Sequence, residues 1–212
     1  MSIQFSFAPT QNDYHPTNLE IKKYKADGSL SDNFKNKCRD FLELMNKEIQ
    51  DFQTKYNSGT LQQYQEIIRF YDSKEQFYEL TPFYNVEPSI SFAGISFKSS
   101  EQLICFAKTL YSNDYSTSFK ILIQSKSYYA HNYAKNVEEC LNWNNIYYPI
   151  VFTANNYKFK NEALKQMLLG TRGKHLIYDS KYDNKLGIGK DGNGQNILGI
   201  MLMMIRDIVN SN

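Results

Sequence analysis

The most informative stretch of the chain is residues 90–111, ISFAGISFKSSEQLICFAKTLY. Isoleucine and phenylalanine alternate with serine on both sides of Gly94, which predicts a short β-hairpin that turns at this glycine. Ser99 follows as a candidate N-cap, and Gln102 completes a capping box, so a helix is expected from there to about Tyr111. A hairpin that leads directly into a helix indicates a fold that mixes α and β structure.

Most of the chain around this stretch is predicted to be helical. Apolar residues recur at steps of three and four in six further segments, a spacing typical of helices that bury one face. The segments are Leu30 to about Tyr56, Thr117 to Ser125, Tyr128 to Lys135, Val137 to about Phe152, Lys160 to Leu169 and Asn196 to about Val209. Short strands are expected at 67–71 and 176–178. Because helices outnumber strands and no regular βαβ alternation occurs, the predicted class is α+β, a mostly helical domain with a small sheet.

The first 64 residues are predicted to form an arm and an amphipathic helix, followed by a domain of residues 65–212. The helix has Ser31 or Asp32 as its N-cap. Its apolar face consists of Phe34, Cys38, Phe41, Leu42, Met45, Ile49 and Phe52. We expect this face to dock either on the main domain or on a second subunit, which would form a homodimer through the extension. An interaction protein that uses the helix to bind a partner is a third alternative.

The composition predicts a folded protein outside the membrane. The 212 residues are 42% hydrophobic and 15% aromatic, which is enough to bury a core and too aromatic for a disordered chain. No apolar stretch approaches the roughly 20 residues of a spanning helix. Residues 1–13 lack the basic and apolar regions of a signal peptide. We therefore expect a cytoplasmic protein with no membrane partner.

The cysteines and histidines are few and lie far apart in the sequence. Three cysteines are an odd number, and their spacing matches neither a disulfide framework nor a zinc motif. We therefore expect a reducing compartment, no clustered transition-metal site and no cofactor, while carboxylates that bind Mg²⁺ stay open. The residues are Cys38, Cys105, Cys140, His15, His131 and His175.

Positive charge is concentrated in residues 158–190. This segment has eight lysines and arginines against three acidic residues, whereas residues 1–157 have 15 against 17. The segment forms either a positive surface that faces phosphates or a set of ordinary solvated side chains. The basic residues are Lys158, Lys160, Lys165, Arg172, Lys174, Lys181, Lys185 and Lys190.

A glycine-rich loop precedes the last helix. Residues 187–192, GIGKDG, match the pattern GxGxxG, but no βαβ unit surrounds them and no acidic ribose ligand follows at the expected distance, so a Rossmann site is excluded. The loop leads into a helix that starts near Gln195 or Asn196. Free backbone N–H groups there could hold a phosphate, or the glycines could serve only as tight turns.

Four further residues are candidates for a site. Glu101 and Lys108 lie seven residues apart on one helix, about 10 Å along its axis, and they bracket apolar neighbours; they form either a pocket wall or a solvated helix edge. Trp143 is either a core residue or a ring that stacks on a base or sugar. Asp183 precedes the glycine loop, where a functional and a structural role are equally open.

Taken together, these motifs resemble the NADAR (YbiA-like) family over about residues 65–212. The resemblance rests mainly on Ser99-Ser100-Glu101-Gln102 with Lys108, and on Asp183 with Gly187-Ile188-Gly189, Gly194-Gln195-Asn196-Ile197-Leu198-Gly199 and Arg206. Further matches include Leu80-Thr81-Pro82-Phe83-Tyr84 and Asn142-Trp143. The chain departs from the family pattern at Pro82, Asn142, Tyr178 and Leu186.

The resemblance implies an N-glycosidase, a hydrolase that removes ADP-ribose from guanine bases in DNA or other nucleic acid. A riboflavin-pathway phosphoribosylamino-pyrimidine is an alternative substrate, and a module that binds ADP-ribose or a nucleotide without cleaving it is an alternative function. The implied catalytic residues are Glu101, Lys108 and Asp183, and the implied substrate-binding residues are Trp143, Asn196, Gly187, Gly189 and Phe83. Glu101 would stabilise an oxocarbenium-like ribose or activate water, or Lys108 would form a Schiff base with an opened ribose.

Overall fold

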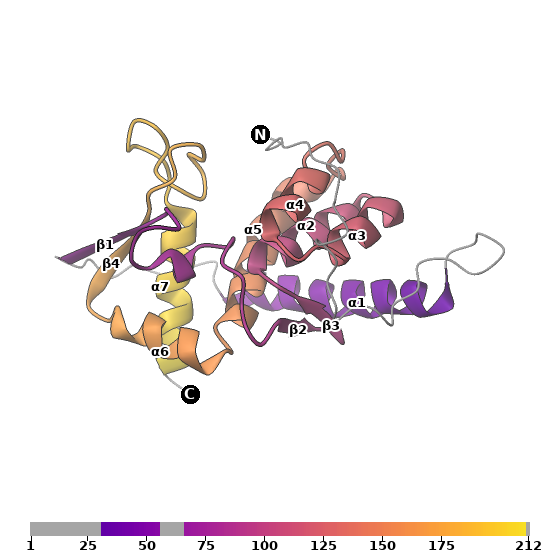
Figure 1. Ribbon diagram of the computed structural model, residues 1–212, viewed down its shortest axis with the longest axis horizontal. Coiled ribbons are helices and arrows are strands. Elements are labelled where there is room, and N and C mark those ends of the chain that lie inside the picture. Colours follow the sequence, from indigo (N-terminus) through magenta and orange to yellow (C-terminus); the bar gives the residue numbers. More distant parts are fainter. Residues whose placement is uncertain (1–30, 56–65, 211–212) are drawn as a thin grey trace.

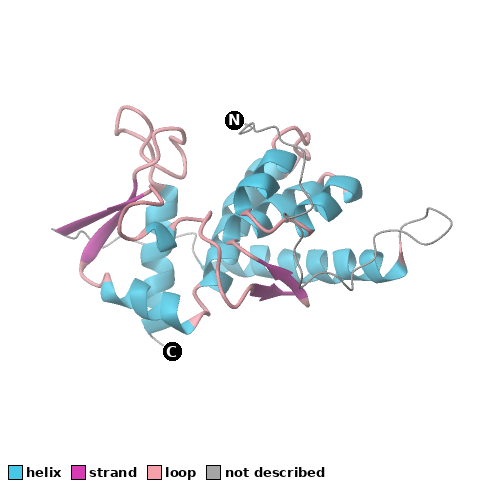
Figure 2. Ribbon diagram, viewed as in Figure 1, coloured by secondary structure: helices cyan, strands magenta, loops and turns pink. Residues whose placement is uncertain are grey.

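The computed structural model describes residues 31–55 and 66–210. The elements, in chain order, are α1 (Asp32–Lys55), β1 (Glu66–Phe70), a 3₁₀ turn (Tyr78–Leu80), β2 (Ile90–Phe92), β3 (Ile95–Phe97), α2 (Ser100–Tyr111), α3 (Tyr115–Leu122), α4 (Ser127–Ala134), α5 (Trp143–Lys158), α6 (Glu162–Gly170), β4 (Lys174–Tyr178) and α7 (Ile197–Asn210). The described residues thus have the expected α+β class, with helices far outnumbering the short strands (Figure 2).

Helix α5 lies between the two ends of the molecule. Figure 1 shows β1, β4, α6 and α7 at one end and α1 to α4 with the β2–β3 hairpin at the other. Helix α5 contacts α1 and α2 on one side and α7 on the other, so a single hydrophobic core runs through both ends. No helix in the described part of the chain combines the length and apolar character needed to cross a membrane.

Helix α1 is part of this core. The Ser31 hydroxyl caps it by accepting a hydrogen bond from the Phe34 amide at 3.2 Å. The Phe41 ring is fully buried and contacts the rings of Phe92, Phe97 and Phe106 edge-on. The described apolar face of α1 is therefore covered by the main domain, and the alternative of an exposed partner-binding face is wrong. The predicted arm, residues 1–30, lies outside the described residues, and the homodimer stays a prediction.

The hairpin and the start of α2 follow the sequence prediction closely. Strands β2 and β3 pair antiparallel, and the two turn residues Ala93 and Gly94 have φ of 50° and 67°. Ser99 Oγ accepts from the Gln102 amide at 3.1 Å. The Gln102 side chain differs from an ordinary capping box because it accepts from the Lys98 amide, at 2.6 Å. The hairpin thereby fixes where α2 begins.

Strand β4 joins the sheet to the last helix. It pairs in parallel with β1, and α7 packs against it. The Asn196 side chain lies across the junction: Oδ1 accepts from the Tyr178 amide at 2.9 Å, and Nδ2 donates to the Leu176 carbonyl at 2.8 Å. A Cβ on Gly199 would lie well inside 3.0 Å of the Leu176 carbonyl oxygen, so only glycine lets α7 approach β4 this closely.

Helix α5 is the element that the sequence pattern locates least well. The pattern predicts Val137 to about Phe152, whereas the helix begins at Trp143 and continues to Lys158. Pro149 lies inside the helix and is buried. Proline normally interrupts a helix, but burial of neighbours such as Ile150 and Val151 against both ends of the molecule outweighs that local cost.

Candidate active site

Glu101 lies in the first turn of α2, where the helix dipole favours a negative charge. Its backbone N–H donates to the Pro82 carbonyl at 2.9 Å. The residue is only 8% exposed, and a buried carboxylate is costly unless it is paired. The sequence could not show which group pairs with it.

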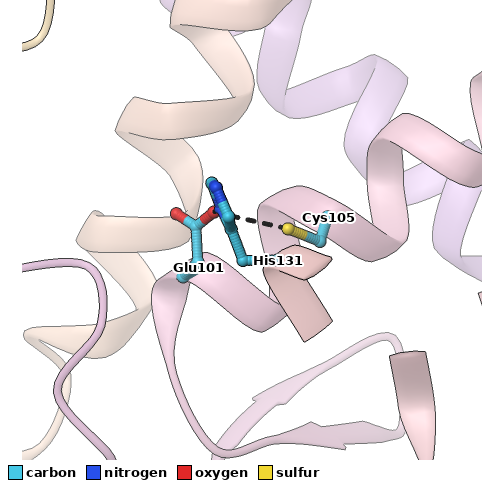
Figure 3. Close-up of side chains that lie close together, drawn as sticks. All are labelled: Glu101, Cys105 and His131. Atoms are coloured by element: carbon cyan, nitrogen blue, oxygen red, sulfur yellow. Dashed lines mark hydrogen bonds and ion pairs between the residues drawn. The ribbon is translucent and has the colours of Figure 1, made fainter. Parts of the chain in front are cut away.

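His131 of α4 supplies that pair. Its Nδ1 contacts Glu101 Oε1 directly in a buried pair, and the Cys105 thiol donates to the same oxygen from one helical turn further along α2, at 3.4 Å. Figure 3 shows the three side chains pointing toward one another. Because both contacts use Oε1, Oε2 is the oxygen available to a substrate.

Two tyrosines lie near both Glu101 and Asp183. Burial raises the pKa of Tyr147 well above its ordinary value, and the negative charges of Glu101 and Asp183 raise it further. Burial, Glu101 and Asp183 raise the pKa of Tyr178 in the same way. Tyr147 comes from α5 and Tyr178 from β4, so elements from both ends of the molecule gather around the two carboxylates.

Asp183 is held by the loop that carries it. Its Oδ1 accepts from the amides of Lys185 and Leu186 at 2.8 and 2.9 Å. These bonds form an Asx-type turn that orients the carboxylate and leaves Oδ2 for other contacts. The side chain is half-buried, which suits a group that meets a ligand at the edge of a site.

Three further predicted residues lie around this centre. Lys108 is buried two turns along α2 and forms an ion pair with Glu139, Nζ to Oε1 at 3.7 Å. The ring of Phe83 lies 5.3 Å from the His131 ring, between centroids. Trp143 is 6% exposed and packs 5.6 Å from Tyr147, so it belongs to the core and also lies beside the Tyr147 ring.

The glycine loop does not offer the free amides that the sequence suggested. The Gly189 amide donates to the Ser180 and Asp183 carbonyls, and the Asn196 amide donates to Gly187. Gly187 is enclosed, since a Cβ there would lie 2.9 Å from the Asp183 carbonyl. The Gly189 amide is therefore already engaged within the loop, and phosphate binding by the loop stays a prediction. Asn196 joins β4 to α7 through both ends of its side-chain amide, which corrects its expected place among ribose ligands.

The positive segment also needs a correction. Lys158 is fully buried, and its ammonium donates to the Thr81 carbonyl at 2.7 Å, so it is not part of a positive surface. Lys181, Lys185 and Lys190 are exposed on the loop that carries Asp183. A phosphate-facing surface would exclude Lys158 and could use these loop lysines.

The sequence missed His131, Tyr147 and the proximity of Cys105 to His131. Ligand atoms of Glu101, Cys105 and His131 lie within 4.8 Å of one another, so the expectation that no cysteine and histidine cluster together is wrong. His131 is 30 residues from Glu101 and lies on another helix. The available signal was its place among the buried alanines of α4, Ala130 and Ala134, which indicates a histidine facing inward.

Comparisons with known proteins bear on this centre. The family model of the NADAR domain matches residues 69–210. The chain belongs to the NADAR family. The matched region contains every element from α2 to α7 and thus all the residues of the candidate site, whereas α1 lies outside it.

The NADAR fold is also seen in a solved structure. The chain is similar to the NMR structure of the E. coli protein YbiA, with a TM-score of 0.62 and 24% identity, covering 71% of this chain and 88% of that one. At this identity the likeness supports the fold alone. A comparison with curated proteins finds no match. The NADAR family is known for N-glycosidase activity.

Proposed function

We propose that this NADAR protein is an N-glycosidase that hydrolyses the C1′–N bond of an ADP-ribosyl conjugate and releases ADP-ribose from guanine bases in nucleic acid. The observation that carries the proposal is the buried Glu101 carboxylate, held through Oε1 by His131 and facing a centre that also contains Asp183. A fixed, desolvated negative charge is what a developing oxocarbenium ion needs nearby.

The chemistry divides among the residues of the centre. As the C1′–N bond breaks, the base leaves with the bonding electrons and positive charge builds on the ribose. Glu101 Oε2 stabilises this charge or takes a proton from the water that attacks C1′. Asp183 binds ribose hydroxyls through Oδ2, and the aromatic rings of Trp143 and Tyr147 exclude water from the reacting carbon.

The competing route uses Lys108. Its amine would attack C1′ of the ring-opened conjugate, displace the base nitrogen together with a proton and form a Schiff base, which water then hydrolyses to release ADP-ribose. In the structure its ammonium is buried and paired with Glu139, so this route requires the ion pair to open and the lysine to lose its proton. The carboxylate route needs no such rearrangement, and this favours Glu101 as the first candidate.

The loop that carries Asp183 supports a substrate with several phosphates. Lys181, Lys185 and Lys190 are exposed there, and Tyr182, next to Asp183 in the sequence, is 85% exposed. Exposed lysines beside an exposed aromatic ring suit phosphates and a stacked base. A nucleic-acid conjugate fits this arrangement better than a free phosphoribosyl-pyrimidine, which carries fewer phosphates.

The test is the release of ADP-ribose from a guanine-ADP-ribosylated oligonucleotide by wild type and by Glu101→Gln. The substitution keeps size and hydrogen bonding but removes the charge, so turnover should fall about a hundredfold or more while ADP-ribose still binds. Glu138→Gln is the matched control, because Glu138 is an exposed carboxylate outside the centre. It should turn over like wild type.

Two results would redirect the proposal. If Glu101→Gln is fully active, Lys108→Ala is inactive and borohydride traps a covalent adduct on the native protein, the Schiff-base route is correct. If the native protein cleaves none of guanine-linked ADP-ribose, NAD and phosphoribosylamino-pyrimidines yet binds ADP-ribose, it is a binding module. Chromatography of released products measures cleavage, mass spectrometry of the protein detects the trapped adduct, and calorimetry measures ADP-ribose binding.

A further inference from the structure

Glu101, Cys105 and His131 are also three potential metal ligands in contact with one another. We propose that these three side chains form a binding site for a zinc-like divalent metal ion, and that the bound ion switches off the candidate active site by occupying the Glu101 carboxylate. The proposed inhibition by the metal rests on the proposed glycosidase function, whereas the metal site itself is argued from the geometry of the three residues.

The spacing of the Glu101 and Cys105 ligand atoms fits a tetrahedral ion, whereas Glu101 Oε1 and His131 Nδ1 are in direct contact and must separate to bind the same ion. Glu101 and Cys105 are four residues apart and therefore lie on the same face of α2, with Sγ and Oε1 separated by 3.4 Å. Zinc lies about 2.3 Å from sulfur and about 2.0 Å from oxygen, which at a tetrahedral angle separates the two ligand atoms by roughly 3.5 Å. His131 reaches the same point from α4, which packs along α2.

The donor set selects the kind of metal. Sulfur, imidazole nitrogen and carboxylate oxygen together suit zinc and similar borderline ions, whereas Mg²⁺ and Ca²⁺ prefer oxygen ligands alone. All three residues are less than 9% exposed, so little water competes with them. Three protein ligands leave one position for water or for a substrate atom, as in metal sites that are not purely structural.

Metal binding competes with the contacts seen here. The Cys105 thiol loses its proton to solvent when sulfur binds the ion, and the Glu101–His131 contact opens so that Oε1 and Nδ1 each face the metal. The ion then neutralises the carboxylate. A neutralised Glu101 cannot stabilise positive charge on a ribose, so occupancy and glycosidase turnover exclude each other.

The metal site is tested first without substrate. Co²⁺, which takes the place of zinc and is visible in absorption, is titrated into chelator-treated protein. We expect one Co²⁺ per chain with a thiolate-to-cobalt charge-transfer band that Zn²⁺ removes. Cys105→Ala should lose the band and weaken binding more than about a hundredfold, while the control Cys140→Ala, a partly exposed cysteine outside the cluster, should keep both.

Two outcomes of the Co²⁺ titration would contradict the proposed metal site. A wild-type protein with no thiolate band, or the same band in Cys105→Ala, would show that sulfur does not bind the ion there. His131→Gln provides a second variant in case Cys105→Ala folds poorly. It should retain the thiolate band at a higher Co²⁺ concentration, and an unchanged affinity would remove His131 from the ligand set.

The proposed inhibition by the metal is tested with the oligonucleotide assay. Zn²⁺ should abolish ADP-ribose release by wild type, a chelator should restore it, and Cys105→Ala should keep most of its own metal-free activity at that Zn²⁺ concentration. Bound zinc without loss of activity would overturn the inhibition and leave the glycosidase intact. If the protein cleaves nothing, the Co²⁺ spectra still decide the metal site, so the two failures are distinguishable.

Discussion

The Glu101 carboxylate depends on its neighbours for its orientation. His131 and Cys105 both bind Oε1, and the helix start at Ser99 fixes the backbone beneath it. A hydrogen bond to a carboxylate in a poorly hydrated place is stronger than the same bond in water, and it restricts the rotamers of both side chains. We therefore regard His131 as a positioning residue, which acts on the substrate through Glu101.

Replacing His131 by glutamine should lower kcat by about tenfold to a hundredfold, the worth of one hydrogen bond to a charged group, with little change in KM. The glutamine fills similar space but lacks the rigid imidazole ring that holds Nδ1 against Oε1. Steady-state rates of ADP-ribose release provide the measurement. His175→Gln, on β4 and outside the cluster, serves as the control and should have wild-type kinetics. A His131→Gln enzyme with unchanged kcat would mean that Glu101 needs no support from the imidazole.

Lys158 is a fully buried lysine whose pKa is strongly shifted. Burial lowers its pKa from 10.5 to about 7, and the negative charge of Glu79 opposes this shift. Its ammonium lies over the rings of Tyr84 and Phe159 and donates to the Thr81 carbonyl. It therefore anchors the segment that precedes α2, at a cost that depends on pH.

Stability should rise with pH because of Lys158. Below about pH 7 the lysine is protonated in both the folded and the unfolded chain, so the folded state bears the full cost of the buried charge. Between about 7 and 10.5 the unfolded chain holds one more proton, and stability gains roughly 1.4 kcal/mol per pH unit. In urea unfolding across this window, the free energy of unfolding of wild type should rise with pH relative to that of Lys158→Met.

Other groups that titrate in this window cancel in that difference, because both proteins contain them. Lys190→Met, which changes an exposed lysine, should follow the wild-type curve at every pH. Parallel curves for wild type and Lys158→Met would show that the lysine titrates alike in the folded and unfolded chain.

At the scale of elements, the junction of β4 and α7 places the Asp183 loop. The loop leaves β4 after Tyr178 and returns at α7, and Asn196, just before α7, bonds back to Leu176 and Tyr178 of β4. Gly199 lets the first turn of α7 lie directly against the Leu176 carbonyl. The position of the loop therefore depends on a backbone approach that a side chain would prevent.

Gly199→Ala should destabilise the protein by about 1–3 kcal/mol, since the new Cβ overlaps backbone and the Asn196 amide, neither of which can move freely. Gly170→Ala is the matched control. That glycine ends α6, and no atom lies within 4 Å of the place that an alanine methyl would take, so alanine should be neutral or slightly stabilising. Thermal unfolding of both variants measures the contrast, and equal melting temperatures would contradict the close approach.

Local sequence rules predicted the elements whose signals are local. Ser31 caps α1, Gly94 turns the hairpin and Ser99 starts α2, because each depends on residues two to four positions away. The start and the end of α5 depend on packing between distant segments, and these were missed. The same reason hid His131, since two helices must meet before a histidine can be matched to Glu101.

For the whole molecule, the core extends beyond the region that the family model matches. Helix α1 precedes residue 69, yet Phe34, Phe41 and Met45 are fully buried among residues of the domain. The ring of Phe52 also packs on Phe152 of α5. The described helix and the NADAR region are thus expected to unfold together.

Phe41→Ala should lower the free energy of unfolding by about 3–5 kcal/mol, because it leaves a cavity among three aromatic rings. The loss should appear in one transition shared by far-UV circular dichroism and by Trp143 fluorescence. Glu43→Ala changes an exposed residue of the same helix and should shift stability by no more than about 0.5 kcal/mol. Two separate transitions in the variant would show that α1 unfolds independently of the domain.

The internal bonding of the glycine loop affects the thermodynamics of binding. The amides of Gly189 and Gln195 already bond to loop carbonyls, that of Ile188 bonds to the Tyr178 carbonyl of β4, and Asp183 is fixed by its own turn. A ligand therefore meets a carboxylate whose conformational entropy was lost during folding rather than at the moment of association. Such preorganisation leaves more of the contact energy for affinity. The loop then binds the ligand in the conformation it already has and does not need to close over it.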